Sequence, residues 1–145
     1  MAAFLLTLML GACHRELPTA TVVEMGPYSI VPGPPMRAEF QKVTGRISAT
    51  VGTRFGVGYV ISGPPKGSAL GLREAWRYPE PGVPDRLTGR LRRTYERERT
   101  CTVGNECLTG YVIERGNEIA PGTWILEVWH EEQLLLRKSF EMTAG

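Results

Sequence analysis

The chain has 145 residues, a formal net charge of +2 at pH 7, 17 glycines and 11 prolines. This length accommodates one domain with one core. The small net charge gives no overall field that would attract nucleic acid, so we expect no nucleic-acid partner. The high share of glycine and proline favours short strands and turns over long helices.

The N-terminus has the pattern of a bacterial lipoprotein signal. An apolar run over residues 2–10 leads into Leu10-Gly11-Ala12-Cys13. The run is too short to cross a bilayer, which takes about 20 residues, but it suits the apolar region of a signal peptide. We expect that residues 1–12 are removed, that Cys13 carries a lipid, and that residues 13–20 form a flexible tether. The alternative is a buried apolar segment with a cysteine by chance.

The lipid anchor also predicts a location. A lipidated Cys13 would hold the mature chain on a membrane. The residue after it is His14 rather than Asp, which resembles lipoproteins of the outer membrane. We therefore expect the protein in the cell envelope, on the periplasmic face of the outer membrane, with an unknown envelope protein or glycan as partner.

From residue 21 onward, apolar residues mostly recur with a period of two, which indicates half-buried strands. The expected strands, in chain order, span residues 21–31, 41–51, 54–62, 70–78, 90–101, 107–114, 122–130 and 134–142. Proline- and glycine-rich segments separate several of them, at 32–35, 63–68 and 79–84. About eight short strands at this spacing predict an all-β, antiparallel β-sandwich over residues 21–145.

The clearest alternation lies in the expected C-terminal hairpin. Trp124, Leu126 and Val128 share one face of its first strand, which we expect to pack in the core. Farther upstream, Gly56 and Gly58 interrupt an apolar strand. They predict either a bulge or a bulky neighbour packed over the backbone.

The cysteines suggest a disulfide. If Cys13 carries lipid, Cys101 and Cys107 remain as a pair around a turn-like insert. In an oxidising periplasm, such a pair would clamp the tip of a hairpin whose arms are residues 90–101 and 107–114. The spacing is not that of a thioredoxin-like redox pair. A zinc site would need two more ligands, and the only histidines are His14 and His130, so we expect no metal and no cofactor.

Several stretches resemble a known bacterial family. They are Gly-Thr-Arg-Phe-Gly at 52–56, residues 59–67 with the run Gly-Pro-Pro-Lys-Gly, and Pro-Gly-Thr-Trp at 121–124 followed by a strand, a turn and Lys-Ser-Phe-Glu at 138–141. Together with residues 21–28 and 43–46, they resemble domain-of-unknown-function family 3859 over residues 21–143. The resemblance implies a small, often exported, immunoglobulin-like β-sandwich without an established activity. The pair Cys101 and Cys107 is not part of this pattern.

Catalytic motifs are incomplete. His130-Glu131-Glu132 begins like a zinc-protease motif, but Leu134 stands where the second histidine belongs. The sequence has no Gly-x-Ser-x-Gly elbow, and its single aspartate is Asp85. These residues offer almost no material for a Ser-His-Asp triad. We therefore expect a protein that is not an enzyme and that serves as an interaction or structural module.

The most unusual surface feature is an arginine-rich stretch within residues 86–99. On a strand, one face of this stretch would carry Arg93, Tyr95, Arg97 and Arg99. One interpretation is a docking face for anionic glycans or lipid headgroups. The other is a solvated face balanced by glutamates on neighbouring strands. Trp129 shares its face with Glu127 and Glu131, so one interpretation is an exposed aromatic residue for sugar stacking, and the other is a core or edge-packing role.

Overall fold

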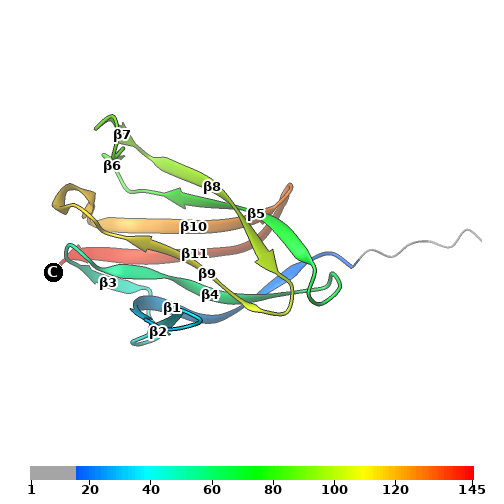
Figure 1. Cartoon of the computed structure of the whole chain (residues 1–145). Helices are drawn as coiled ribbons and strands as arrows, with labels where there is room; N and C mark the ends of the chain where they lie inside the picture. Colours follow the sequence, from blue (N-terminus) through cyan, green and yellow to red (C-terminus); the bar gives the residue numbers. More distant parts are fainter. Residues whose placement is uncertain (1–15) are drawn as a thin grey trace, which may run out of the picture.

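The structure is a computed structural model that describes residues 16–145, so the expected signal and Cys13 lie outside it. Two sheets face each other (Figure 1). The first has the order β2-β1-β4-β9, formed by β1 (Thr19–Val31), β2 (Arg37–Phe40), β4 (Arg54–Ser62) and β9 (Glu106–Val112). The second has the order β3-β11-β10-β5-β8, formed by β3 (Arg46–Ala49), β5 (Ala69–Arg77), β8 (Thr94–Thr102), β10 (Gly122–His130) and β11 (Gln133–Ala144).

A small ribbon extends from one end of the sandwich. It is formed by β6 (Val83–Pro84) and β7 (Leu91–Arg92), and the short 3-10 helix η1 (Gly116–Glu118) lies in contact with it. The described residues thus contain eleven strands, a few more than the sequence predicts. The predicted β-sandwich is confirmed, with one parallel pair, β3 with β11, among antiparallel ones.

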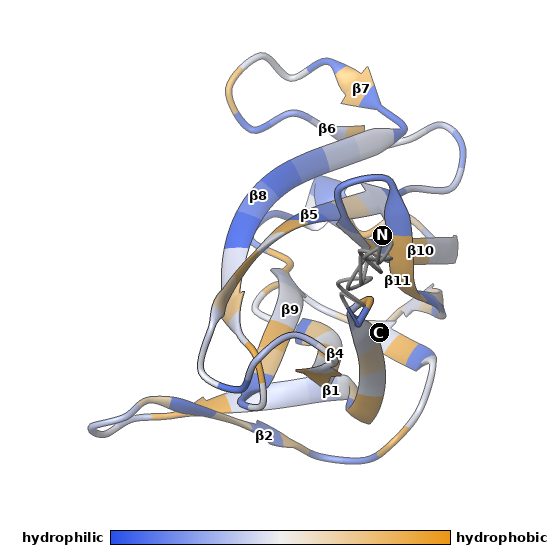
Figure 2. Cartoon of the chain, turned by 90° about the vertical axis from the view of Figure 1, so that its right-hand side faces the viewer, coloured by the Kyte–Doolittle hydropathy of each residue, from blue (hydrophilic) through white to orange (hydrophobic). Residues whose placement is uncertain are grey.

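The core lies between the two sheets. As predicted, Trp124, Leu126 and Val128 of β10 are completely buried. Aromatic rings surround Phe55, whose ring centroid lies 5.5 Å from that of Trp124. In contrast, β8 at the sheet edge is the most hydrophilic strand (Figure 2). Edge-to-face packing of large rings therefore supplies the centre of the fold, and the edge carries polar groups.

The glycines near the centre of the first sheet allow aromatic side chains to lie directly on the backbone. A Cβ atom at Gly110 would overlap the hydroxyl of Tyr28. A Cβ atom at Gly58 would lie 3.6 Å from the ring of Phe40. Both predicted features therefore occur near Gly58, because the pairing of β1 with β4 also shifts register between Val22 and Glu24, opposite Tyr59 and Gly58. At Gly56 the close neighbour is instead the β9 backbone, with the Thr109 carbonyl where a Cβ atom would lie.

The expected strand over residues 41–51 is wrong. Residues 37–40 form β2 in the first sheet, and residues 46–49 form β3 in the second. The chain therefore crosses between the layers at 41–45. The backbone N–H groups of Gln41 and Thr44 donate to β1 carbonyls at 3.1 and 3.2 Å. These bonds hold the crossing segment against β1, so residues 41–51 do not form one continuous strand.

The disulfide is confirmed, but the predicted hairpin around it is wrong. Cys101 and Cys107 are bonded, with Cα atoms 6.1 Å apart. However, β8 pairs with β5 in one sheet and β9 pairs with β4 in the other. The turn crosses between sheets because Val103 donates its N–H to Ser68 and Gly104 donates to Ile61, both at 2.9 Å. The disulfide therefore ties together the edges of the two layers.

The two ends of the sandwich differ. At one end, β1 begins at Thr19, which pairs with Ser62 of β4. Thr19 is one of the residues of the expected tether at 13–20. Arg54 pairs with Val112 toward the other end, where β6, β7 and η1 lie (Figure 1). Within residues 16–145, no helix is long and apolar enough to span a membrane.

Candidate functional site

The arginine-rich stretch forms most of edge strand β8, and part of it turns inward. Tyr95 lies opposite Trp76, and Arg97 lies opposite Glu74. Both β5 partners are buried, so this face of β8 points toward the space between the sheets. The shared face predicted from the alternation is found for Tyr95, Arg97 and Arg99, but it faces the interior margin of the sandwich.

Glu74 is the centre of a polar network on this inner face. Its carboxylate is completely buried, and Arg97 donates to it from Nε at 2.7 Å. Arg99 Nε lies 3.4 Å from the other carboxylate oxygen, to which Thr109 Oγ1 donates at 2.8 Å. The hydroxyl of Tyr59 lies 3.1 Å from Thr109 Oγ1. Charge-assisted hydrogen bonds therefore compensate the cost of burying this carboxylate.

The same arginines close the seam between the sheet edges. Arg99 Nη1 donates to the carbonyl of Leu108 on β9 at 2.6 Å. The side chains of Arg97 and Arg99 are 39% and 41% exposed, so their heads are only partly available to solvent. Two guanidinium groups that already bind an interior carboxylate leave limited capacity for an external anion.

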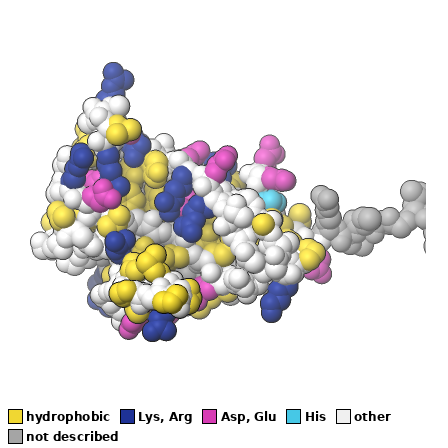
Figure 3. Space-filling view, viewed as in Figure 1, with side chains coloured by type: hydrophobic (Ala, Val, Ile, Leu, Met, Phe, Trp, Pro, Cys, Tyr) yellow, Lys and Arg dark blue, Asp and Glu magenta, His cyan; other side chains and the backbone are white. Residues whose placement is uncertain are grey.

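The remaining members of the predicted surface are also engaged. Arg93 donates to the carbonyl of Tyr78 at 3.0 Å and to Glu80 at 3.1 Å. The guanidinium of Arg92 lies 4.5 Å from the ring centroid of Tyr95. In Figure 3, Lys and Arg side chains on this face alternate with Asp and Glu side chains. This arrangement matches the interpretation in which neighbouring carboxylates balance the arginines.

Trp129 lies apart from these residues. It pairs with Arg73 of β5 on the outer face of the second sheet, opposite the face that carries Arg97. The Arg73 guanidinium lies 5.3 Å from the Trp129 ring, which is half-buried. On the same outer face, the buried carboxylate of Glu127 accepts a hydrogen bond from Arg77 at 2.7 Å. The structure therefore does not bring Trp129 together with the arginines of β8.

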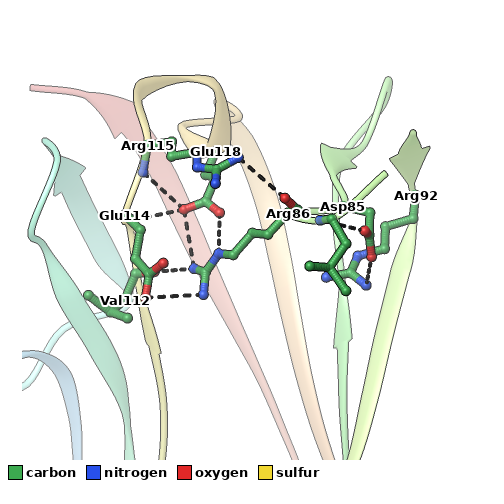
Figure 4. Close-up of polar contacts among 8 residues, drawn as sticks. Asp85, Arg86, Arg92, Val112, Glu114, Arg115 and Glu118 are labelled. Carbon is green, nitrogen blue, oxygen red and sulfur yellow. Dashed lines mark hydrogen bonds and ion pairs between the residues drawn. The ribbon is translucent and has the colours of Figure 1, made fainter. Parts of the chain in front are cut away.

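A second ion-pair cluster joins the ribbon to η1, and sequence reasoning did not find it (Figure 4). Arg86 donates to Glu118 from Nε at 2.6 Å and to the carbonyl of Val112 at 2.9 Å. Glu118 also accepts the backbone N–H groups of Glu114 at 2.7 Å and Arg115 at 3.2 Å. A capping-box pattern would have Ser or Thr three residues before Glu118, and Arg115 stands there instead, so no local sequence pattern marks this cluster.

The charge state of Glu118 follows from these contacts. Burial favours the neutral acid, but the hydrogen bonds from Arg86 and from two backbone N–H groups outweigh it. The pKa of Glu118 is therefore lowered from its ordinary value. In the other network, burial raises the pKa of the Tyr59 phenol, against the hydrogen bond to Thr109. Tyr59 thus stays protonated at neutral pH, which does not favour a role as general base.

The sequence matches a known protein family over most of its length. The family described as domain of unknown function (DUF3859) matches residues 32–142. The chain belongs to this family. The resemblance predicted from the sequence is therefore confirmed, over a somewhat shorter span than residues 21–143.

The DUF3859 fold also has a solved counterpart. The chain is similar to an immunoglobulin-like protein from Pseudomonas aeruginosa, with a TM-score of 0.70 and 23% sequence identity. The match covers 90% of this chain and 99% of that chain. At this identity, the likeness shows the immunoglobulin-like fold alone. The chain has no significant match among curated proteins.

The chemistry of this DUF3859 domain is dominated by arginine–carboxylate pairs. Glu74, Glu118 and Glu127 are its buried carboxylates, and each accepts a hydrogen bond from an arginine at 2.6–2.7 Å. No group of three or more potential metal ligands occurs among residues 16–145. These arginine–carboxylate pairs hold strands and loops together at the margins of the core.

Proposed function

We propose that the protein is a lipid-anchored module of the cell envelope that acts by binding a partner rather than by catalysis. The observation that carries this proposal is the lipoprotein motif ending at Cys13. Only a short segment separates Cys13 from Thr19, where the sandwich begins. An acyl chain at that cysteine would hold this end of the domain close to a membrane surface.

A binding role is supported by how the polar residues are used. The buried carboxylates of Glu74, Glu118 and Glu127 are each held in an ion pair with an arginine, so all three already have a structural role. Arg97 and Arg99 both form ion pairs with the Glu74 carboxylate. This argues against the alternative in which the β8 arginines bind an anionic glycan or a lipid headgroup.

The end far from Thr19 offers a surface for a protein partner. The loop between β6 and β7 projects there (Figure 1), and Leu87 is 96% exposed. The Asp85 carboxylate accepts the backbone N–H groups of Leu87 and Thr88, both at 2.8 Å. A loop that such bonds hold in place can present this side chain to an envelope partner at a small ordering cost.

Fractionation of intact cells tests the anchor. We expect the wild-type chain in the membrane fraction and the Cys13→Ser chain in the soluble fraction, because the serine hydroxyl cannot accept the thioether-linked lipid. A Cys13→Ser chain that stays with the membrane would contradict the anchor.

Site-specific photocrosslinking in the same cells tests the partner surface. A crosslinker at position 87 should give a discrete protein adduct. The matched control is position 23 on β1, where Val23 is also exposed. Equal adduct patterns at both positions, or no adduct at position 87, would contradict a partner-binding loop.

A further inference from the structure

A polar cleft lies on the side of the sandwich opposite the arginine-rich strand. We call it the β1–β3 cleft, because β1, β3 and the segments next to them form most of its walls. Its volume is about 640 Å³, and its charged lining residues are Lys42, Arg46, Arg54 and Glu141. A cleft of this size falls in the range of small-molecule sites rather than of protein interfaces.

The cations of this cleft differ from those of β8 in having no ion-pair partner. Within residues 16–145, no carboxylate lies within 4.0 Å of Lys42, Arg46 or Arg54 in an ion pair. The one lining carboxylate, Glu141, accepts a hydrogen bond from Thr123 at 2.5 Å. The lining therefore carries an excess of positive charge that the protein itself does not neutralise.

Hydroxyl groups complete the lining. Ser29 Oγ accepts a hydrogen bond from Gln41 at 3.2 Å, and Thr53 Oγ1 accepts one from the N–H of Thr50 at 3.0 Å. The Ser29 hydroxyl accepts in its contact and so keeps a proton to donate into the cleft, whereas the Thr53 hydroxyl also lies 3.4 Å from Thr50 Oγ1. Ser48 adds a third hydroxyl. Unpaired cations together with hydroxyl donors are complementary to an oxyanion.

The walls are also held in place before any ligand arrives. The segment that carries Lys42 is fixed by backbone bonds from Gln41 to Pro27 and from Thr44 to Met25. The turn before Arg54 is fixed by the bond from Thr53 to Thr50, at 3.1 Å. Preorganised walls reduce the ordering cost of binding.

We infer that the β1–β3 cleft binds a phosphate group, held by Lys42, Arg46 and Arg54. A phosphate monoester carries about −1.5 to −2 charges at pH 7, which suits three cations better than a single carboxylate does. The group can belong to a soluble phosphate compound or to a lipid headgroup. This inference goes beyond the proposed function and does not depend on the anchor.

The first test uses inorganic phosphate and the full chain carrying Cys13→Ser, with NMR shifts as readout. We expect phosphate to shift the amide signals of the cleft segments selectively, and added NaCl to weaken binding. Arg46→Gln/Arg54→Gln should raise the apparent Kd at least tenfold. The matched control, Lys66→Gln/Arg90→Gln, removes the same charge elsewhere and should keep binding. All four side chains are exposed, so folding is expected in both variants.

The second test distinguishes the two sources of the phosphate. The same chains are sedimented with phosphatidylcholine vesicles, with and without phosphatidic acid, whose headgroup is a phosphate monoester. Cleft-dependent binding to the phosphatidic acid vesicles indicates a lipid headgroup, and cleft-dependent binding of inorganic phosphate alone indicates a soluble compound. The inference is overturned if neither probe responds to the cleft variant more than to the control variant. Phosphate shifts spread evenly over all basic segments would overturn it as well.

Discussion

The ion pair between Glu74 and Arg97 should stabilise the fold far more than a surface pair. Glu74 is completely buried, and Arg97 Nε lies 2.7 Å from its carboxylate. Breaking a fully buried pair costs about 3–5 kcal/mol. Arg97 is 39% exposed and Arg99 remains 3.4 Å away as a second cation. We therefore expect Arg97→Ala to lower the free energy of unfolding by about 2 kcal/mol, below the fully buried case.

A double-mutant cycle measures this coupling directly. Glu74→Gln, Arg97→Ala and their combination are compared by urea denaturation, and we expect a coupling energy of about 1–2 kcal/mol. The control cycle uses Arg73 and Glu96, whose side chains are 41% and 50% exposed at 3.1 Å. That pair should couple by less than about 0.5 kcal/mol. Equal coupling in the two cycles would refute the structural role assigned to the β8 arginines.

Three further predictions concern the other sites. Gly110→Ala should lower stability by about 1–3 kcal/mol through overlap with Tyr28, and Tyr28→Phe should recover part of the lost Tm; an unchanged Tm would contradict this. The lowered pKa of Glu118 predicts stability that is complete above its ordinary value of 4.5 and is lost as pH falls through the folded pKa. Denaturation from pH 7 to 3 should show a smaller loss for Glu118→Gln, and equal losses would contradict it. Removing the disulfide in the variant Cys101→Ala/Cys107→Ala should lower the free energy of unfolding by about 2 kcal/mol, measured by urea denaturation. An unchanged urea midpoint would contradict a stabilising role for this disulfide.

The fold was largely predictable because alternation is a local property. Trp124, Leu126 and Val128 stand at every second position, and this spacing alone places them in the core. Sheet assignment is not local. The residues between Cys101 and Cys107 do not indicate that the turn passes from one sheet to the other. The hydrogen bonds that fix this path join the turn to the carbonyls of Ile61 and Ser68, which are distant in the sequence.

The candidate sites were harder to predict for the same reason. The sequence shows many arginines near β8 but not which of them have partners. Glu74, which binds Arg97 and Arg99, belongs to another strand. Lys42 and Arg54 are not neighbours in the sequence and belong to no run of basic residues, yet the fold places them in one cleft. Pairing of charges depends on tertiary contacts, so composition alone directs attention to the more arginine-rich segment.

The measurement that tests the central claim most directly is the intact mass of the protein taken from the membrane fraction, with and without reductant. The account predicts a chain that begins at Cys13, carries a lipid-sized increase in mass, and gains two protons when the Cys101–Cys107 bond is reduced. A full-length chain without lipid would contradict an anchored envelope module.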